Sequence, residues 1–87
     1  MKVTERTLVE MCRRINNEQL KHWDSGLKVE RRAEDYVVLR IFRKPQQGRP
    51  GSLDIFNGSA REVKAFIEGV ANAAEAANNG ASGEVNS

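Results

Sequence analysis

The most informative part of the chain is Leu27-Lys-Val-Glu-Arg-Arg-Ala-Glu-Asp-Tyr-Val-Val-Leu-Arg-Ile-Phe-Arg43, which contains two runs with the patterns of β-strands. Residues 27–32 alternate apolar and charged side chains, and residues 36–43 are rich in β-branched and aromatic side chains. Both patterns favour strands. Ala33-Glu34-Asp35 lies between them and is the expected reversal, so the stretch predicts two adjacent antiparallel strands.

Helical periodicity precedes these strands. Residues 4–17 carry apolar side chains spaced i, i+3, i+4 and i+7, which line one face of a helix. These side chains are Leu8, Met11, Cys12 and Ile15. Thr4 can cap the start of this helix. Residues 18–23 could extend the helix or form another turn, and Asp24-Ser25-Gly26 ends it.

A second helix is predicted near the end of the chain. Ser59-Ala-Arg-Glu62 is a capping box, in which the serine and glutamate side chains each bond a backbone N–H of the first turn. An apolar stripe follows it, made of Val63, Phe66, Ile67, Val70 and Ala74. Asn78-Asn79-Gly80 should end this helix, which leaves residues 79–87 as an expected disordered tail beyond a single domain at residues 1–78.

The segment between the second strand and this helix completes the fold. Residues 44–52 contain two Pro, two Gly and two Gln and are expected to form a loop, and Leu53–Phe56 is a short third strand. The predicted order is α-β-β-β-α. The expected fold class is α+β, a two-layer sandwich with a three-stranded antiparallel sheet and both helices on one face.

Composition excludes several functional classes. The chain has 87 residues with 14 Lys and Arg against 12 Asp and Glu, a net charge of +2, which fits one small domain. No run approaches the ~18 apolar residues of a membrane span, and residues 1–10 lack the apolar core of a secretory signal. The protein is therefore expected to be intracellular, with no membrane partner.

Candidate catalytic and metal-binding residues are few. One Cys excludes an internal disulfide, and one Cys with one His cannot supply a zinc site. Cys12 falls on the apolar stripe of the first helix, where a core role is favoured. His22 has no nucleophile or acid at a recognisable spacing. We therefore predict no catalytic residue, no metal, no cofactor and no enzymatic activity.

The central strand offers a candidate binding surface. Val37, Leu39 and Ile41 share one face, and Tyr36, Val38, Arg40 and Phe42 share the other. If the first set meets the helices, the second is left exposed, because a two-layer fold has no further cover. Partner-contacting residues are then expected in this strand and in the acid-free basic segment that follows it. They are Tyr36, Arg40, Phe42, Arg43, Lys44 and Arg49.

This candidate surface has several interpretations. Aromatic and Arg side chains are enriched at the centres of protein interfaces, which favours a protein partner. They also resemble a surface on which single-stranded bases stack, with basic residues contacting phosphates. The same residues could form a homodimer seam, be covered by the long loop, or belong to a solvated basic loop. The chain is expected to be a monomer or a homodimer.

Two stretches suggest a kinship. The segments Leu8-Val-Glu-Met-Cys-Arg-Arg-Ile-Asn-Asn17 and Gly58-Ser-Ala-Arg-Glu-Val-Lys-Ala-Phe-Ile-Glu-Gly-Val70 resemble small accessory proteins of bacteriophages and prophages. The resemblance implies an interaction role in the cytoplasm of a bacterial host, such as inhibition of a defence system in the manner of anti-CRISPR proteins. It assigns no functional residues.

The predicted element order also matches double-stranded-RNA-binding domains in outline. Those domains carry a basic run at the start of the last helix, whereas this chain has Arg61-Glu-Val-Lys64, with an acid inside the run. The leading hypothesis is therefore a non-enzymatic protein that modulates or inhibits a protein complex, with or without nucleic acid, by occupying its surface. The alternative is a nucleic-acid-binding module that uses the basic strand end and loop.

Overall fold

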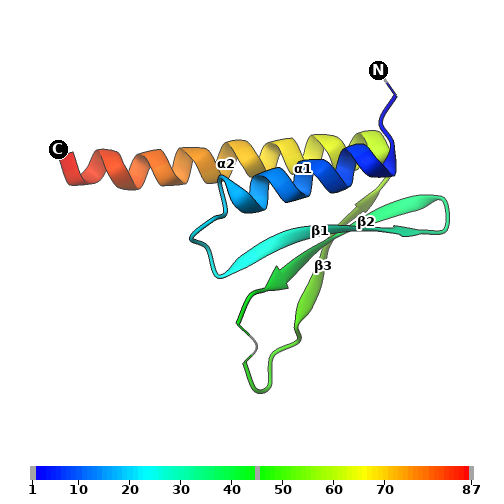
Figure 1. Ribbon diagram of the computed structural model, residues 1–87, viewed down its shortest axis with the longest axis horizontal. Coiled ribbons are helices and arrows are strands. Elements are labelled where there is room, and N and C mark those ends of the chain that lie inside the picture. The colour runs from blue at the N-terminus through cyan, green and yellow to red at the C-terminus, as the bar shows by residue number, and fades with distance from the viewer. Residues whose placement is uncertain (1, 45, 87) are drawn as a thin grey trace.

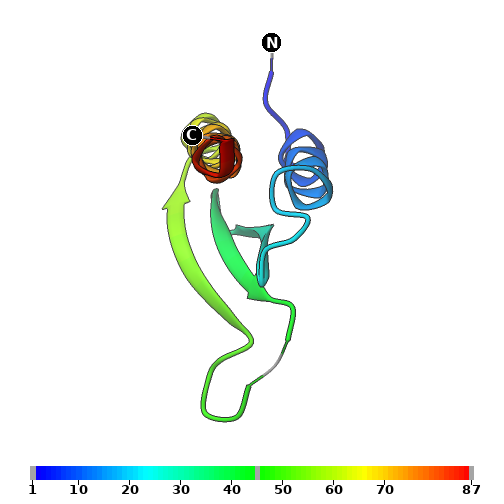
Figure 2. The same cartoon turned by 90° about the vertical axis from the view of Figure 1, so that its left-hand side faces the viewer.

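The computed structural model describes residues 2–44 and 46–86, with side chains as far as Asn79. Its elements follow the order α1 (Glu5–Asn17), β1 (Ser25–Arg32), β2 (Asp35–Phe42), β3 (Ser52–Gly58) and α2 (Ala60–Asn86). The three strands form one antiparallel sheet in the order β1-β2-β3. Both helices lie on one side of this sheet (Figures 1 and 2), which confirms the two-layer α+β fold.

The core fills the space between the helices and one face of the sheet, the inner face. In the register of the sheet, Val38 lies opposite Val29 of β1 and Phe56 of β3, and all three side chains point toward the helices. The helices contribute an apolar stripe each, as their sequence periodicity predicts. Their buried members are Leu8, Cys12, Ile15, Val63, Ile67 and Ala74.

Helix α1 begins with a cap at Thr4, whose Oγ1 accepts a hydrogen bond from the N–H of Thr7 at 3.3 Å. The Oγ1 of Thr7 in turn accepts a hydrogen bond from the N–H of Thr4. These two bonds satisfy two N–H donors at the start of the helix that have no partner within it. The helix ends at Asn17, and residues 18–24 form turns rather than more helix. These turns bury Leu20 and leave Trp23 41% exposed.

Helix α2 begins with the expected capping box. The N–H of Ser59 donates to Glu62 Oε1 at 2.9 Å, and the N–H of Glu62 donates to Ser59 Oγ at 3.3 Å. The bond from the Ser59 N–H stabilises the ionised carboxylate and, as the largest cause, lowers the pKa of Glu62 below its ordinary value. One turn later, the ring of Phe66 stacks on that of Phe56 in β3 with centroids 4.5 Å apart, which fixes α2 against the sheet.

The far end of α2 differs from the sequence expectation. The helix continues past Asn78-Asn79-Gly80 to Asn86, and its C-terminal half extends beyond α1 (Figure 1). Asn78 lies within the helix, and its side chain forms hydrogen bonds with the 18–24 turns. Its Nδ2 donates to the carbonyl of Gln19 at 3.0 Å, and its Oδ1 accepts from Trp23 Nε1 at 3.3 Å. The division into a domain at residues 1–78 and a tail at 79–87 stays a prediction.

The outer edge of β1 is closed by a side chain. Asn16 of α1 donates through Nδ2 to the carbonyl of Leu27 at 2.9 Å and accepts from the N–H of Leu27 at 2.8 Å. The amide thus takes the place of a neighbouring strand at this position, which blocks edge-to-edge pairing there. Gly26 permits the contact, because a Cβ on residue 26 would lie 2.8 Å from Asn16 Oδ1.

Candidate interaction surface

The expected exposure of the Tyr36–Phe42 face is wrong, because that face of β2 is the one that meets the helices. Val38 is fully buried, and Tyr36 packs against the core. The alternation within β2 could not decide between its faces, because both are apolar. The neighbouring strand β1 determines which face of the sheet meets the helices. Its apolar side chains, Leu27 and Val29, lie on the same side as Val38, whereas its charged side chains, Lys28, Glu30 and Arg32, lie on the other side.

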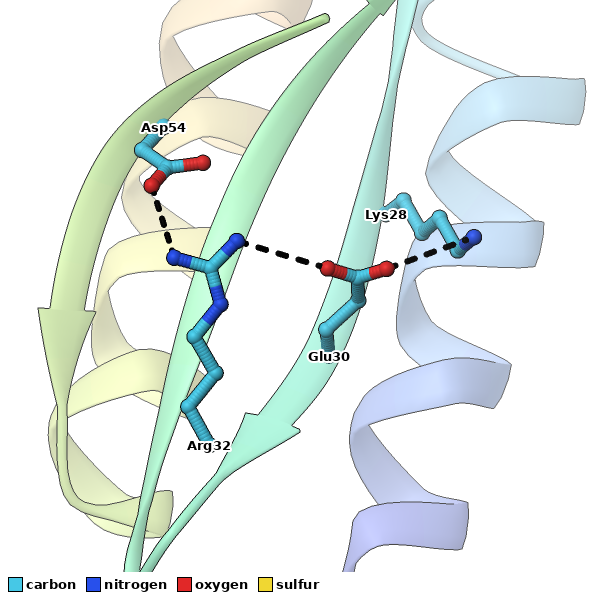
Figure 3. A network of polar contacts seen from close by, with 4 residues as sticks. All are labelled: Lys28, Glu30, Arg32 and Asp54. Carbon is cyan, nitrogen blue, oxygen red and sulfur yellow. Dashed lines mark hydrogen bonds and ion pairs between the residues drawn. The ribbon is translucent and has the colours of Figure 1, made fainter.

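The opposite, outer face of the sheet is covered by charged side chains rather than left apolar. Arg32 donates to Asp54 of β3 at 2.8 Å and lies 3.6 Å from Glu30, which in turn lies 3.6 Å from Lys28. Figure 3 shows this network across the central strand, on the side away from the helices. Val37 and Leu39 lie beneath it and are only 1% and 6% exposed.

This network explains how a sheet without a second helical layer buries its outer face. Long Arg, Lys and Glu side chains lay their aliphatic stems over apolar residues while their charged ends stay in water. The hydrogen bond with Asp54 also raises the pKa of Arg32. Charged side chains therefore cover Val37 and Leu39 on the outer face, and the oligomeric state stays a prediction.

Three of the predicted contact residues come together at the end of β2. The guanidinium carbons of Arg40 and Arg49 lie 4.8 Å and 4.0 Å from the centroid of the Phe42 ring. Each is close enough for a cation–π interaction. We call these three residues the arginine cluster. The backbone N–H of Phe42 donates to the carbonyl of Gly51 at 3.0 Å, which closes the base of the β2–β3 loop and brings Arg49 back onto the strand.

The polar ends of the arginine cluster are only partly bonded. Arg40 donates to Ser25 Oγ at 2.8 Å and forms a longer contact, 3.4 Å, with Asp24 Oδ1. Arg49 donates through Nη2 to the carbonyl of Lys44 at 3.1 Å. Its Nε is buried and has no hydrogen-bond partner among the described residues. The cluster therefore holds donor capacity that is not used within the fold.

The two remaining basic candidates behave differently. Arg43 donates to the carbonyls of Lys21 at 2.9 Å and Asn16 at 3.1 Å, and its N–H donates to the carbonyl of Asp24 at 2.9 Å. It thereby ties the end of β2 to the end of α1, so its guanidinium has a structural role. Lys44 is exposed beside the arginine cluster. Whether any of the six residues contacts a partner stays a prediction.

An apolar groove adjoins the arginine cluster on the inner face. It has a volume of about 220 Å³ and lies between α2, the 18–24 turns and the sheet. We call it the groove. Its apolar walls are Leu20, Trp23, Leu27, Ile55 and Val70, and Arg40 lines its edge together with Ser25 and Gly26. Arg40 therefore belongs to both the groove and the arginine cluster.

Large apolar side chains around the groove remain in contact with solvent. Trp23 is 41% exposed, Ile55 is 40% exposed, and Leu53, which pairs with Arg40 across the sheet, is 43% exposed. A register shift in the β2–β3 pairing leaves Ile55 without a residue opposite it, as in a β-bulge, and Ile55 lines the groove. Sequence reasoning gave Trp23 and Leu53 no binding role. In the sequence, Trp23 is an apolar residue next to a turn and Leu53 is an apolar residue on an edge strand, and neither position by itself indicates binding.

Two observations concern metal ligands and the cysteine among the described residues. No group of three or more His, Cys, Asp or Glu side chains among them is placed to hold a metal ion. Burial of the Cys12 thiol raises its pKa to about 11, which disfavours the reactive thiolate. Likewise, no helix in the described chain is both long enough and apolar enough to cross a membrane.

Comparisons with protein families, curated proteins and solved structures find no match to this chain. The surface is therefore interpreted from its own geometry and chemistry.

Proposed function

We propose that this chain is a small non-enzymatic binding protein that acts by occupying a surface of a partner protein. The observation that carries the proposal is the groove, which exposes Trp23 and Ile55 beside the arginine cluster, with exposed Leu53 paired to Arg40 on the neighbouring strand. Binding energy in protein interfaces concentrates where aromatic, apolar and Arg side chains gather around a desolvated centre. Such a surface needs no reacting groups to function.

The size of the groove supports a protein partner over a small molecule. Its volume of about 220 Å³ is below the roughly 300–1,000 Å³ of typical small-molecule sites. A groove of this size suits one side chain inserted by a partner, with further contacts made by the apolar residues around it.

The placement of the aromatic residues weighs against nucleic-acid stacking. Phe56 and Phe66 stack on each other, Tyr36 packs against the core, and Phe42 is already contacted by two guanidinium groups. Trp23 is then the one exposed aromatic side chain of the chain's five. Proteins that bind single strands through their bases use several such faces in succession.

The biological setting we propose follows the resemblance of residues 8–17 and 58–70 to phage accessory proteins. In that setting the protein acts in the bacterial cytoplasm and modulates or inhibits a host or phage complex, such as a defence system. Surface occupation suits that role, because an inhibitor needs affinity for its target and no chemistry of its own.

The experiment is retention of proteins from a bacterial lysate on the immobilised chain. The test variant is Leu53→Ser with Ile55→Ser, which removes exposed apolar surface beside the groove. The matched control is Val9→Ser, because Val9 is 45% exposed on α1 and does not line the groove. We expect the double variant to lose the retained proteins and the control to keep them. Equal retention by the folded double variant would refute the proposal.

A further inference from the structure

We infer that the groove and the arginine cluster together bind an acidic protein segment that inserts one large apolar side chain. This inference rests on the proposed function and specifies the chemistry of the partner.

The apolar half of the site is walled by residues from three parts of the fold. The groove is bounded by Val70 of α2 on one side and by Leu20 and Trp23 of the 18–24 turns on another. Ile55 of the sheet also lines it. Trp23 is held in place by its bond to Asn78 at 3.3 Å, so this wall is positioned before any partner arrives. A preformed wall lowers the ordering cost of binding.

The charged half of the site favours an anionic partner. Arg40 and Arg49 lie against Phe42, and exposed Lys44 follows β2 next to them. Among the described residues, the acid that pairs with the cluster is Asp24, which lies 3.4 Å from Arg40 and is itself 61% exposed at its side chain. Such a long, exposed pair is weak, so a partner carboxylate can replace it.

The guanidinium groups of the arginine cluster use only some of their N–H donors in bonds to described residues. Arg49 Nε is buried and unpaired among the described residues, and the Arg49 Nη2 bond goes to a single carbonyl. A guanidinium binds a carboxylate through parallel N–H donors, and the guanidinium-bearing side chains of Arg40 and Arg49 are only partly buried, so a partner carboxylate can approach them from solvent.

The two halves share Arg40, so they act on one continuous segment. Arg40 lines the edge of the groove and touches Phe42 of the cluster. A segment whose apolar side chain fills the groove would therefore place its neighbouring residues over Arg40 and Arg49. Acidic neighbours would be attracted there, and basic neighbours would be repelled. Charge complementarity thus selects an acidic segment.

The test uses fluorescence anisotropy with labelled synthetic probes. The main probe is a short peptide in which Asp and Glu flank one Phe and one Leu. One counterpart carries Lys in place of every acid, another carries Ser in place of Phe and Leu, and a single-stranded oligonucleotide is the fourth probe. We expect the main probe to bind at least about tenfold more tightly than each peptide counterpart and than the oligonucleotide. Its affinity should fall between about 50 and about 300 mM salt.

Variants locate the binding on the chain. Ile55→Ser and Arg49→Met should each weaken the main probe by at least about tenfold. Val9→Ser and Arg6→Met change exposed residues of α1 away from the groove and should leave the affinity unchanged. Circular dichroism on each variant verifies that the fold is retained.

Each result has one interpretation. Equal binding of the acidic and lysine peptides, or binding of the oligonucleotide in place of the peptides, overturns the acidic-segment inference. If no peptide binds but the Leu53→Ser/Ile55→Ser variant still loses its lysate partners, the inference fails and the proposed function stands. If neither assay responds to changes at the groove, both fail.

Discussion

The contact between Asn16 and Leu27 gives the sharpest stability prediction. The Asn16 amide bonds both the N–H and the carbonyl of Leu27, at 2.8 Å and 2.9 Å, and Leu27 is only 7% exposed. Removing the amide leaves two buried backbone groups without partners, at about 1–3 kcal/mol for each group that water cannot reach. Both bonds are part-buried, so water can partly replace the amide, and Asn16→Ala should lower the free energy of unfolding by about 1–3 kcal/mol.

Gly26 tests the same contact from the other side. A Cβ on residue 26 would lie 2.8 Å from Oδ1 and 3.0 Å from Cγ of Asn16, so the amide must move and weaken its bonds. Gly26→Ala should cost about 1–2 kcal/mol in the native sequence. In the Asn16→Ala background the obstruction is gone. There the same change should be neutral or stabilising by about 0.5 kcal/mol, because alanine orders at lower entropic cost than glycine.

The assay is urea unfolding of the wild type, both single variants and the double variant, followed by circular dichroism. Relative to the total stability expected for a domain of this size, about 4–13 kcal/mol, these changes are large enough to measure. We expect a coupling energy of at least about 1 kcal/mol between the two positions. Additivity within about 0.5 kcal/mol would refute the reasoning that the Asn16 amide seals the edge of β1.

Three further predictions concern other parts of the fold. On the outer face, Arg32→Ala should lower the urea midpoint more than Arg32→Met, because the methionine side chain still covers Val37. Equal effects of the two changes would show that the ion pairs of Arg32, rather than its aliphatic stem, stabilise this face. The bonds to Ser59 lower the pKa of Glu62, so its contribution to stability is present above the ordinary value of 4.5 and is lost as pH falls through the lowered pKa. Glu62→Gln should therefore flatten the loss of thermal stability below about pH 4.5, and an unchanged profile would argue against this carboxylate. Because burial raises the pKa of Cys12 to about 11, its thiol should resist a thiol reagent at pH 8 until the protein unfolds, and rapid modification of the native chain would contradict its burial.

The order of elements could be predicted from sequence because each local signal agreed with the final structure. The capping box at Ser59 and the apolar stripes of both helices are short-range features, and tertiary packing reinforced them. The end of α2 was less predictable. Asn78 reads as a helix terminator from its local sequence, but its side chain is used by the distant 18–24 turns.

The candidate site was only partly predictable, because its geometry depends on strand pairing. The face of β2 that meets the helices is set by β1 and β3, whose polar side chains cover Val37 and Leu39. Arg40 and Phe42 were expected to lie together, and they do. No local pattern linked Trp23 with Ile55, since the groove joins parts of the chain that are far apart in sequence.

The most direct test of the central claim is site-specific photo-crosslinking from the groove. A photoreactive benzoylphenylalanine replaces Ile55 in one variant and Val9 in a matched control, two apolar positions exposed by 40% and 45%. After irradiation in bacterial lysate, with and without an excess of the acidic Phe- and Leu-containing peptide, adducts are resolved by mass. The account predicts a discrete protein adduct from position 55 that the peptide suppresses, and none from position 9. An adduct from position 9 with none from position 55 would contradict it.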